Sequence, residues 1–447
     1  MRRRSVHPSP RKRARTVWVW AYLFLVTAPL LILLVTPGVP GLGLWWTFAI
    51  ALGFGGLGLM CVQFFLTARL HRATAPFGID VVYYFHRYLG VVALALIAAH
   101  PAILVVDNPA VADFLNPLTA PWYMAAGTLA IAAILVLVAA SLVRKQIRFP
   151  YEAWRVTHVL LAIVAVGLAF AHVGGVQYYL SVPGTRALWI AIVLSLAGAL
   201  AYVRVLRPWR LHRRPYRVID VRRERGDAWT LAVEPAGHEG IAFEPGQFAW
   251  LTLGGSPFLM NDHPFSFSSS PGQPHGRLEF TIKELGDFTR TIGRVERGAV
   301  AFVDGPYGAM TLDRHDADGC VFIAGGIGIA PIMSMLCTLA DRGDPRPFLL
   351  FYAYRRWDRM TCREAIEDLG RRLDLRVVYV LEEPPDDWVG ERGRITGDVL
   401  DRHLPSGRER LAYFVCGPDA MTQAMERCLR GLGVPASRVH SELFDLV

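Results

Sequence analysis

Two stretches of similar design decide how this chain folds. Residues 86–100 read HRYLGVVALALIAAH and residues 158–172 read HVLLAIVAVGLAFAH, so each stretch has a histidine at both ends of a mainly apolar run. In an α-helix this spacing is a rise of about 21 Å, and it leaves the two side chains about 40° apart around the axis. Both histidines of a stretch are therefore predicted to lie on one face of a membrane-spanning helix.

The composition of the chain supports a membrane protein. The chain has 447 residues, of which 53% are hydrophobic, and its mean hydropathy is +0.31. Both values are high for a soluble protein of this length. The apolar excess lies before about residue 206, whereas the second part has the composition of a soluble protein. Three domains in two solvent environments are expected from this division.

Six apolar runs are each long enough to cross a bilayer as a helix. They lie near residues 17–36, 44–66, 82–106, 121–143, 155–180 and 187–204. Clusters of arginine and lysine follow the second, fourth and sixth runs, while the other loops carry Asp107, Asp113 and a single base, Arg186. The positive-inside rule then predicts a multi-pass protein of the inner or plasma membrane with both termini in the cytoplasm.

Residues 1–15 form a basic tail with seven arginine or lysine residues and no acid. A nucleic-acid-binding tail and a cleavable signal peptide are alternative interpretations. An uncharged run follows the tail at once, at residues 18–36, and this pairing favours a topogenic signal that holds the N-terminus in the cytoplasm. No A-x-A cleavage site follows the run. We therefore expect membrane lipid, and no nucleic acid, as a partner.

The four histidines are candidate metal ligands. Under the predicted topology, His86 and His158 lie at the cytoplasmic depth, and His100 and His172 lie at the outer depth. Two imidazoles that face each other can hold one haem iron from both sides, and two such levels form a ladder of two haems. The levels are about 21 Å apart, which is too far for one tetrahedral zinc site. The alternative is four polar residues that each bond to a neighbouring helix, which the repeated spacing disfavours.

Arg87 and Arg155 lie close in sequence to the histidines of the cytoplasmic level. They either pair with haem propionates or extend to the lipid headgroups. The sequence leaves both interpretations open.

The pattern changes after residue 214. The segments YRVIDVRRE, WTLAVEP, GQFAWLTL and RLEFTIKE alternate apolar and polar residues, which predicts antiparallel strands that close into a small barrel. From residue 320 strands alternate with helices, which indicates an α/β domain. In CVFIAGGIGIAPIMSML a strand leads through Gly325, Gly326 and Gly328 into a helix, and these glycines let the backbone approach a pyrophosphate.

These motifs, in this order, resemble the ferric reductase and NADPH oxidase superfamily over about residues 17–447, in its bacterial-type form of a transmembrane flavocytochrome b. The resemblance implies a multidomain membrane protein with a six-helix transmembrane bundle. The implied domains are a haem domain at 16–206, an antiparallel β-barrel FAD domain at 211–314 and a ferredoxin reductase-like, NAD(P)-binding α/β domain at 318–447.

The resemblance also implies roles for single residues. The HPFS and GDFT motifs would contact FAD through His263, Pro264, Phe265, Ser266, Gly286, Asp287 and Thr289. The nicotinamide nucleotide motifs GPYG and GGIGIAP would contribute Gly305, Pro306, Gly308, Gly325, Gly326, Gly328 and Pro331. The segment beside the nicotinamide ring would be Cys416, Gly417 and Pro418, and Phe444 would cover the flavin. Cys416 and Phe444 are thus the candidate catalytic residues.

The implied electron path runs from NAD(P)H through FAD and two haems of b type to an acceptor outside, because only a flavin accepts a hydride and releases single electrons. Arg355 and Arg356 follow a strand end that carries no acid. They favour NADPH over NADH, since guanidinium groups suit a 2′-phosphate. A solvated basic loop is the alternative.

The sequence leaves the acceptor open among O2, which would give superoxide, a ferric chelate, and a partner protein or quinone. Leu104 stands where animal-type oxidases of the superfamily carry a further histidine, and the outer half of the second span has no arginine. Both departures weaken the interpretation of the chain as a specialised oxidase. The outer loops are short and have no histidine or cysteine cluster for metal. No obligatory protein subunit is expected.

Overall fold

The computed structural model describes residues 17, 19, 20, 22–24, 26, 27, 43–69, 79–177, 180–315 and 317–442. The contacts divide the chain into two compact units. The first consists of Met1–Phe77 and Val81–Arg207, and the second of Gly78–Asp80 and Pro208–Val447. The predicted basic tail lies outside the described residues, and so does most of the first predicted span.

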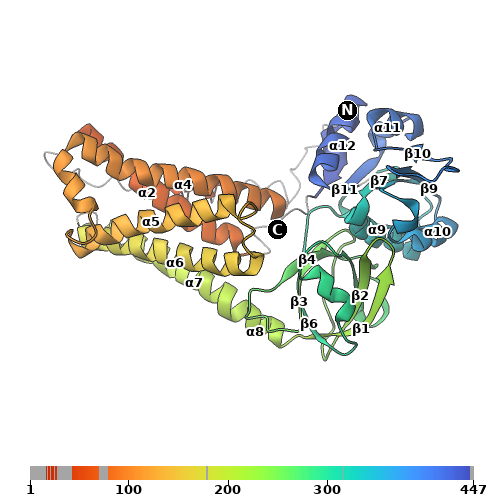
Figure 1. Cartoon of the computed structure of the whole chain (residues 1–447), viewed down its shortest axis with the longest axis horizontal. Coiled ribbons are helices and arrows are strands. Elements are labelled where there is room, and N and C mark those ends of the chain that lie inside the picture. Colours follow the sequence, from red (N-terminus) through yellow and green to blue (C-terminus); the bar gives the residue numbers. More distant parts are fainter. Residues whose placement is uncertain are drawn as a thin grey trace, which may run out of the picture. The chain divides into compact units, whose positions relative to one another are not determined.

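Within the described residues, five helices are long and apolar enough to cross a membrane. Those of the first unit are α2 (Leu44–Thr67), α4 (Ile79–Asp107), α5 (Trp122–Val143), α6 (Tyr151–Val176) and α7 (Pro183–Ala201). Helix α5 packs along α6, and α2 contacts both α6 and α7 (Figure 1). The last five of the six predicted spans are thereby confirmed as helices.

The last helix is longer than its sequence predicts. The predicted span at 187–204 continues through a π-helical turn at Tyr202–Leu206 into α8 (Arg207–His212). The N–H of Arg207 donates to the carbonyl of Tyr202, so backbone hydrogen bonding is not interrupted where the basic residues begin. Arginine is a good helix former, and the change in hydropathy therefore does not end the helix.

The second unit begins with an antiparallel sheet. Its strands are β1 (Tyr216–Glu224), β2 (Ala228–Pro235), β3 (Phe248–Leu253), β4 (His263–Ser266), β5 (Leu278–Lys283) and β6 (Val300–Tyr307), in the order β4-β3-β6-β1-β2-β5. A bridge between Phe267 and Phe280 joins the chain after β4 to β5, so the two edges of the sheet meet. This closure confirms the curled, barrel-like sheet that the alternating segments predict.

The second sheet of this unit is parallel. Its strands are β7 (Cys320–Gly325), β8 (Phe348–Tyr354), β9 (Leu375–Leu381), β10 (Glu391–Arg392), β11 (Ala412–Cys416) and β12 (Val439–Ser441), in the order β10-β9-β8-β7-β11-β12. From β7 the chain builds outward through β8 and β9, and it then returns to place β11 on the other side of β7. In sheets of this kind ligands bind at the carboxyl ends of the strands where the order reverses. That point lies between β7 and β11.

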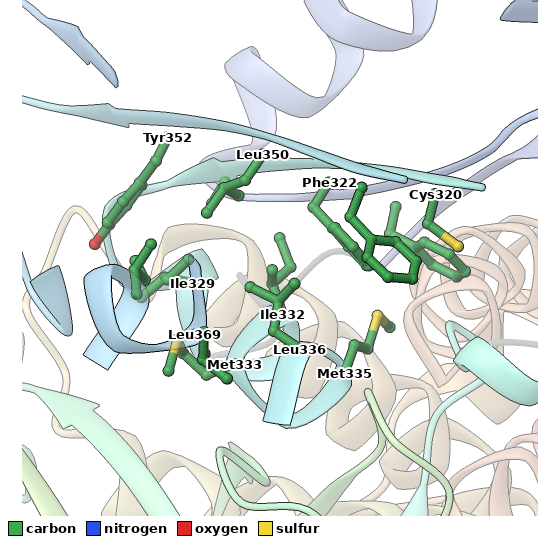
Figure 2. Close-up of a cluster of buried hydrophobic side chains, with 14 of the residues drawn as sticks. Cys320, Phe322, Ile329, Ile332, Met333, Met335, Leu336, Leu350, Tyr352 and Leu369 are labelled. Atoms are coloured by element: carbon green, nitrogen blue, oxygen red, sulfur yellow. The ribbon is translucent and has the colours of Figure 1, made fainter. Parts of the chain in front are cut away.

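Helices cover both faces of the parallel sheet. Helix α9 (Ile329–Arg342) and helix α10 (Arg363–Arg372) pack on one face, and α11 (Gly397–His403) and α12 (Asp419–Gly431) pack on the other. Figure 2 shows Ile332 and Leu336 of α9 beneath Phe322 and Leu350 of the strands. Burial on both faces explains why the strands read as continuous apolar runs.

We predict that Leu336→Ala destabilises the second unit by about 2–5 kcal/mol, because Leu336 is fully buried and the substitution leaves a cavity. Val389→Ala is the matched control, since Val389 is 98% exposed, and its effect should stay within about 0.5 kcal/mol. Thermal unfolding of the purified chain measures both variants. Equal melting temperatures for the two variants would contradict this account of the core.

Candidate functional site

The structure brings the four histidines of the first unit together in two pairs. In the first pair, the ring centroids of His86 and His158 are 6.0 Å apart. In the second pair, those of His100 and His172 are 6.5 Å apart. Each pair joins α4 to α6, as the spacing together with the predicted parallel course of the two spans implies. Their role as metal ligands stays a prediction.

The second pair is held by two matching contacts with the neighbouring helices. The Nδ1 of His100 lies 2.9 Å from the carbonyl oxygen of Ala49 on α2. The Nδ1 of His172 lies 2.9 Å from the carbonyl oxygen of Tyr123 on α5. A carbonyl only accepts hydrogen bonds, so Nδ1 carries the proton in both rings. The lone pair is then on Nε2, which is the nitrogen that a metal would bind.

A glycine follows each of these carbonyls by four residues and makes room for the ring. A Cβ at Gly53 on α2 would lie 3.2 Å from Cγ of His100, and one at Gly127 on α5 would lie 2.9 Å from Nδ1 of His172. Real Cβ atoms are rarely so close to such neighbours. The two glycines therefore let the imidazoles reach the helix backbone.

The first pair has different hydrogen-bond partners. The Nδ1 of His158 lies 3.1 Å from the hydroxyl of Ser141 on α5. Among the described residues, the buried Nδ1 of His86 has no hydrogen-bond partner. The side-chain amide of Gln63 on α2 donates instead to the backbone carbonyl of His86 at 3.0 Å. The two levels therefore differ in how their imidazoles are oriented.

The geometry of both pairs fits a six-coordinate haem. With metal–nitrogen bonds of about 2 Å and about 1 Å from ring centre to nitrogen, two imidazoles on opposite sides of a metal have centroids about 6 Å apart. The observed separations of 6.0 and 6.5 Å agree with this value. No group of three or more histidine, cysteine or acidic residues that could hold a metal occurs among the described residues. Two imidazoles need a ligand such as a porphyrin to complete the coordination of the metal.

In the flavin domain, the HPFS motif forms strand β4. The ring of His263 stacks on Phe288 with centroids 3.9 Å apart, and Phe265 lies near-parallel to Phe288 at 6.1 Å. Ser266 is buried and pairs with Phe248 of β3. The HPFS motif and the GDFT turn therefore meet at Phe288.

The GDFT turn is closed by its own threonine. The resemblance to the ferric reductase and NADPH oxidase superfamily implies that Gly286, Asp287 and Thr289 contact FAD, and this stays a prediction. In the structure, the N–H groups of Leu285 and Gly286 donate to the hydroxyl of Thr289 at 2.8 and 2.9 Å. That hydroxyl in turn donates to the carbonyl of Gly286. Threonine thus closes the turn, because its side chain competes with the backbone for these partners, while the side chain of Asp287 is exposed.

The GPYG motif ends strand β6 beside the same part of the barrel. A cis peptide bond joins Gly305 and Pro306, and Tyr307 pairs with Phe248 of β3. Gly308 has a φ of +109°, a conformation that favours glycine. A Cβ at Gly308 would lie 3.0 Å from Oε2 of Glu442. The flavin domain therefore reaches the end of the nucleotide domain at this glycine.

The two nucleotide loops lie against each other at the point where the strand order reverses. A Cβ at Gly328 would lie 2.2 Å from the carbonyl oxygen of Cys416, and one at Gly417 would lie 3.2 Å from Cα of Gly325. Pro331 is buried in the first turn of α9. At Gly326, with φ of +55°, a Cβ would meet nothing within 4 Å. The loops are thus in contact with each other, and one glycine faces open space that suits a pyrophosphate.

Cys416 is buried at the carboxyl end of β11, and the carboxylate of Glu442 acts on it electrostatically. Burial, and after it the carboxylate of Glu442, raises the pKa of the Cys416 thiol above its usual range. Cys416 is therefore a buried neutral thiol, not a nucleophilic thiolate. Pro418 precedes helix α12 and packs close to Gly325.

The predicted 2′-phosphate contacts are already paired with acids. Arg355 lies 2.6 Å from Glu383, which follows β9, and Arg356 lies 3.0 Å from Asp358. The end of β8 itself carries no acid, as the sequence shows, but the neighbouring parallel strand β9 ends at the same edge of the sheet and brings Glu383 there. The predicted flavin cover, Phe444, lies outside the described residues.

Sequence reasoning missed three residues of these sites. Ser141 carries no signal beyond its position on a predicted span, and Phe288 lies inside a motif from which only Gly286, Asp287 and Thr289 were predicted to contact FAD. Glu442 could have been noticed as an acid close to a terminal aromatic. All three take their place from contacts between segments far apart in the chain.

Comparisons with known proteins agree with this division of the chain. Residues 52–169 match the family model described as ferric reductase like transmembrane component. Residues 322–427 match the oxidoreductase NAD-binding domain. The fold and the paired sites thus define a class, a multi-pass membrane protein that carries a reductase module of the ferredoxin reductase type. The chain belongs to the ferric reductase and NADPH oxidase-like superfamily.

Several relatives share the reductase module. Ferredoxin--NADP reductase B of Sorangium cellulosum is 32% identical over 48% of this chain and 91% of its own length. NADH-cytochrome b5 reductase 1 of Debaryomyces hansenii is 30% identical over 38% of this chain and 62% of its own length. The structure of the ferredoxin reductase in carbazole 1,9a-dioxygenase is 26% identical, with a TM-score of 0.45, over 52% of this chain and 69% of that one. The chain spans 57–62% of the length of three of the curated relatives.

We predict that Gly328→Ala weakens nucleotide binding and destabilises the second unit by about 1–3 kcal/mol, because the added methyl group meets the backbone carbonyl of Cys416. Gly370→Ala is the matched control, since Gly370 lies in α10 with nothing within 4 Å of its added Cβ. Titration of each purified variant with NADPH measures the effect. The same affinity in both variants would show that the close contact at Gly328 does not shape the site.

Proposed function

We propose that the chain transfers electrons from NAD(P)H, through FAD and two bis-imidazole b-type haems, across the membrane to an acceptor on the other side. The observation that carries this proposal is the arrangement of the two imidazole pairs on α4 and α6. Their centroid separations of 6.0 and 6.5 Å suit one metal between each pair. The family of the chain and its nucleotide loops supply the other end of the path.

The residues of the chain would orient the cofactors and keep water away from them. When bound, FAD would supply the change from a two-electron hydride to single electrons, and haems held by the two imidazole pairs would carry those electrons. The carbonyls of Ala49 and Tyr123 hold two of the imidazoles in the tautomer that binds a metal. The apolar helices keep water away from them.

At the other end of the path, the glycine loops would bind the pyrophosphate of the nucleotide through their backbone. The contact between Gly328 and Cys416 fixes the two loops relative to each other. Arg355 remains a candidate for the 2′-phosphate of NADPH, which would replace Glu383 as its partner. A preference for NADPH therefore depends on the exchange of an ion pair, and NADH is also a possible donor.

The orientation of the protein follows from charge. Arg144 and Lys145 come at the end of α5, and Arg207, Arg210, Arg213 and Arg214 lie in or directly after α8. The positive-inside rule places these ends, and the second unit, in the cytoplasm. The second pair of imidazoles is then the outer one, which faces an acceptor such as O2 or ferric iron. An electron-supplying module for a partner protein or a quinone is the alternative function.

We predict that His100→Leu and His172→Leu each lose one haem of two, because each removes one ligand of the same metal. The double variant should lose no more than either single variant. Haem per flavin, measured by pyridine haemochrome and flavin absorbance in purified protein, tests this directly. Retention of two haems in a single variant, or loss of both in the double variant, would refute the ladder.

The acceptor is tested with NADPH, FAD-supplemented protein and a superoxide trap in air, with and without superoxide dismutase. A large signal that the dismutase abolishes identifies O2 as the acceptor at the outer pair. Fast haem reduction with little superoxide excludes a dedicated oxidase, and ferric chelates are then compared with quinones. Absence of haem reduction by either nucleotide in protein that contains haem and FAD would contradict the proposed path.

A further inference from the structure

Ser141 lies at the centre of a small polar cluster between α5 and α6. Its hydroxyl donates to the carbonyl of Leu137 at 2.7 Å. The indole N–H of Trp154 donates to the same hydroxyl oxygen at 3.4 Å, and Nδ1 of His158 lies 3.1 Å from it. A serine hydroxyl has one proton and two lone pairs, so these three contacts use its full hydrogen-bonding capacity.

This arrangement fixes the proton on His158. The single proton of the Ser141 hydroxyl is engaged with Leu137, and the indole of Trp154 can only donate. Nδ1 of His158 must therefore be the donor in its contact with Ser141. The lone pair of this imidazole is on Nε2, the same nitrogen as in His100 and His172.

The two levels nevertheless differ in the strength of their acceptors. Both rings of the second pair donate to backbone carbonyls. In the first pair, His158 donates to a hydroxyl that is already shared with Trp154. Among the described residues, Nδ1 of His86 has no acceptor. A hydrogen bond from Nδ1 raises the basicity of the imidazole and thereby stabilises the more highly charged state of a bound metal.

We propose that Ser141 is a positioning residue that sets the tautomer of His158 and lowers the reduction potential of the metal held by the first pair. This inference rests on the proposed function, because it requires haem at that pair. It also predicts which of the two sites has the lower reduction potential. Among the described residues, the second pair has two carbonyl acceptors and the first pair has one hydroxyl, so we expect the metal of the second pair to have the lower reduction potential.

The test is a redox titration of the purified full-length chain, followed in the α-band of the haem spectrum. In Ser141→Ala one of the two midpoint potentials should shift to a more positive value, and the other should not move. Ser141→Cys fills the same space with a weak acceptor and should shift the same midpoint in the same direction. Ser141→Thr keeps a hydroxyl that can bond to the preceding turn, and it should restore the original value.

Ser195→Ala is the matched control. Ser195 lies on α7, and its hydroxyl donates to the carbonyl four residues earlier at 2.7 Å, as that of Ser141 does. No contact between Ser195 and an imidazole occurs among the described residues. Its replacement should leave both midpoints unchanged.

The outcomes separate the inference from the proposed function. Wild-type protein that binds no haem would contradict the proposed function itself. Two retained haems with unchanged midpoints in Ser141→Ala or Ser141→Cys would overturn the role of Ser141 alone, and so would an equal shift in Ser195→Ala. Selective loss of one haem from Ser141→Ala, with retention in Ser141→Thr, supports the positioning role. In His100→Leu, which keeps only the first pair, the remaining midpoint should be the higher of the two.

Discussion

The hydrogen bond from an imidazole Nδ1 to a neighbouring helix is the interaction on which the membrane unit depends. Polar groups are costly in lipid unless they are satisfied within the protein. The bond from His100 to Ala49 joins α4 to α2, and that from His172 to Tyr123 joins α6 to α5. Each bond satisfies a buried polar group, holds two helices in register and leaves Nε2 available for a metal. The same hydrogen bonds thus fix both the packing of the helices and the orientation of the imidazoles.

In both units, glycines allow another group to approach the backbone closely. Gly53 and Gly127 allow imidazoles to reach helix carbonyls, and Gly328 allows the loop after β7 to touch the loop after β11. In each place a Cβ would displace the group that the site needs. The glycines therefore allow contacts that any larger residue would prevent.

The sequence predicts the elements well and the contacts between them less well. The 14-residue spacing places His86 and His100 on one face of α4, and alternation places β1, β2, β3 and β5, because both depend on periodicity along one segment. The extension of the last helix to His212, the closure of the turn by Thr289 and the pairing of Arg355 with Glu383 depend on local competition or on segments far apart in the chain. The hydrogen bond between His158 and Ser141 also depends on two separate segments, since nothing within α6 indicates that Ser141 on α5 will face it.

The central claim is that each imidazole pair holds one six-coordinate haem. Electron paramagnetic resonance of the oxidised, purified protein, together with the ratio of haem to flavin, tests it most directly. The account predicts two haems for each flavin, both low-spin with two imidazole ligands, and no high-spin signal that binds added cyanide. A single haem for each flavin, or a high-spin centre in the intact protein, would contradict it.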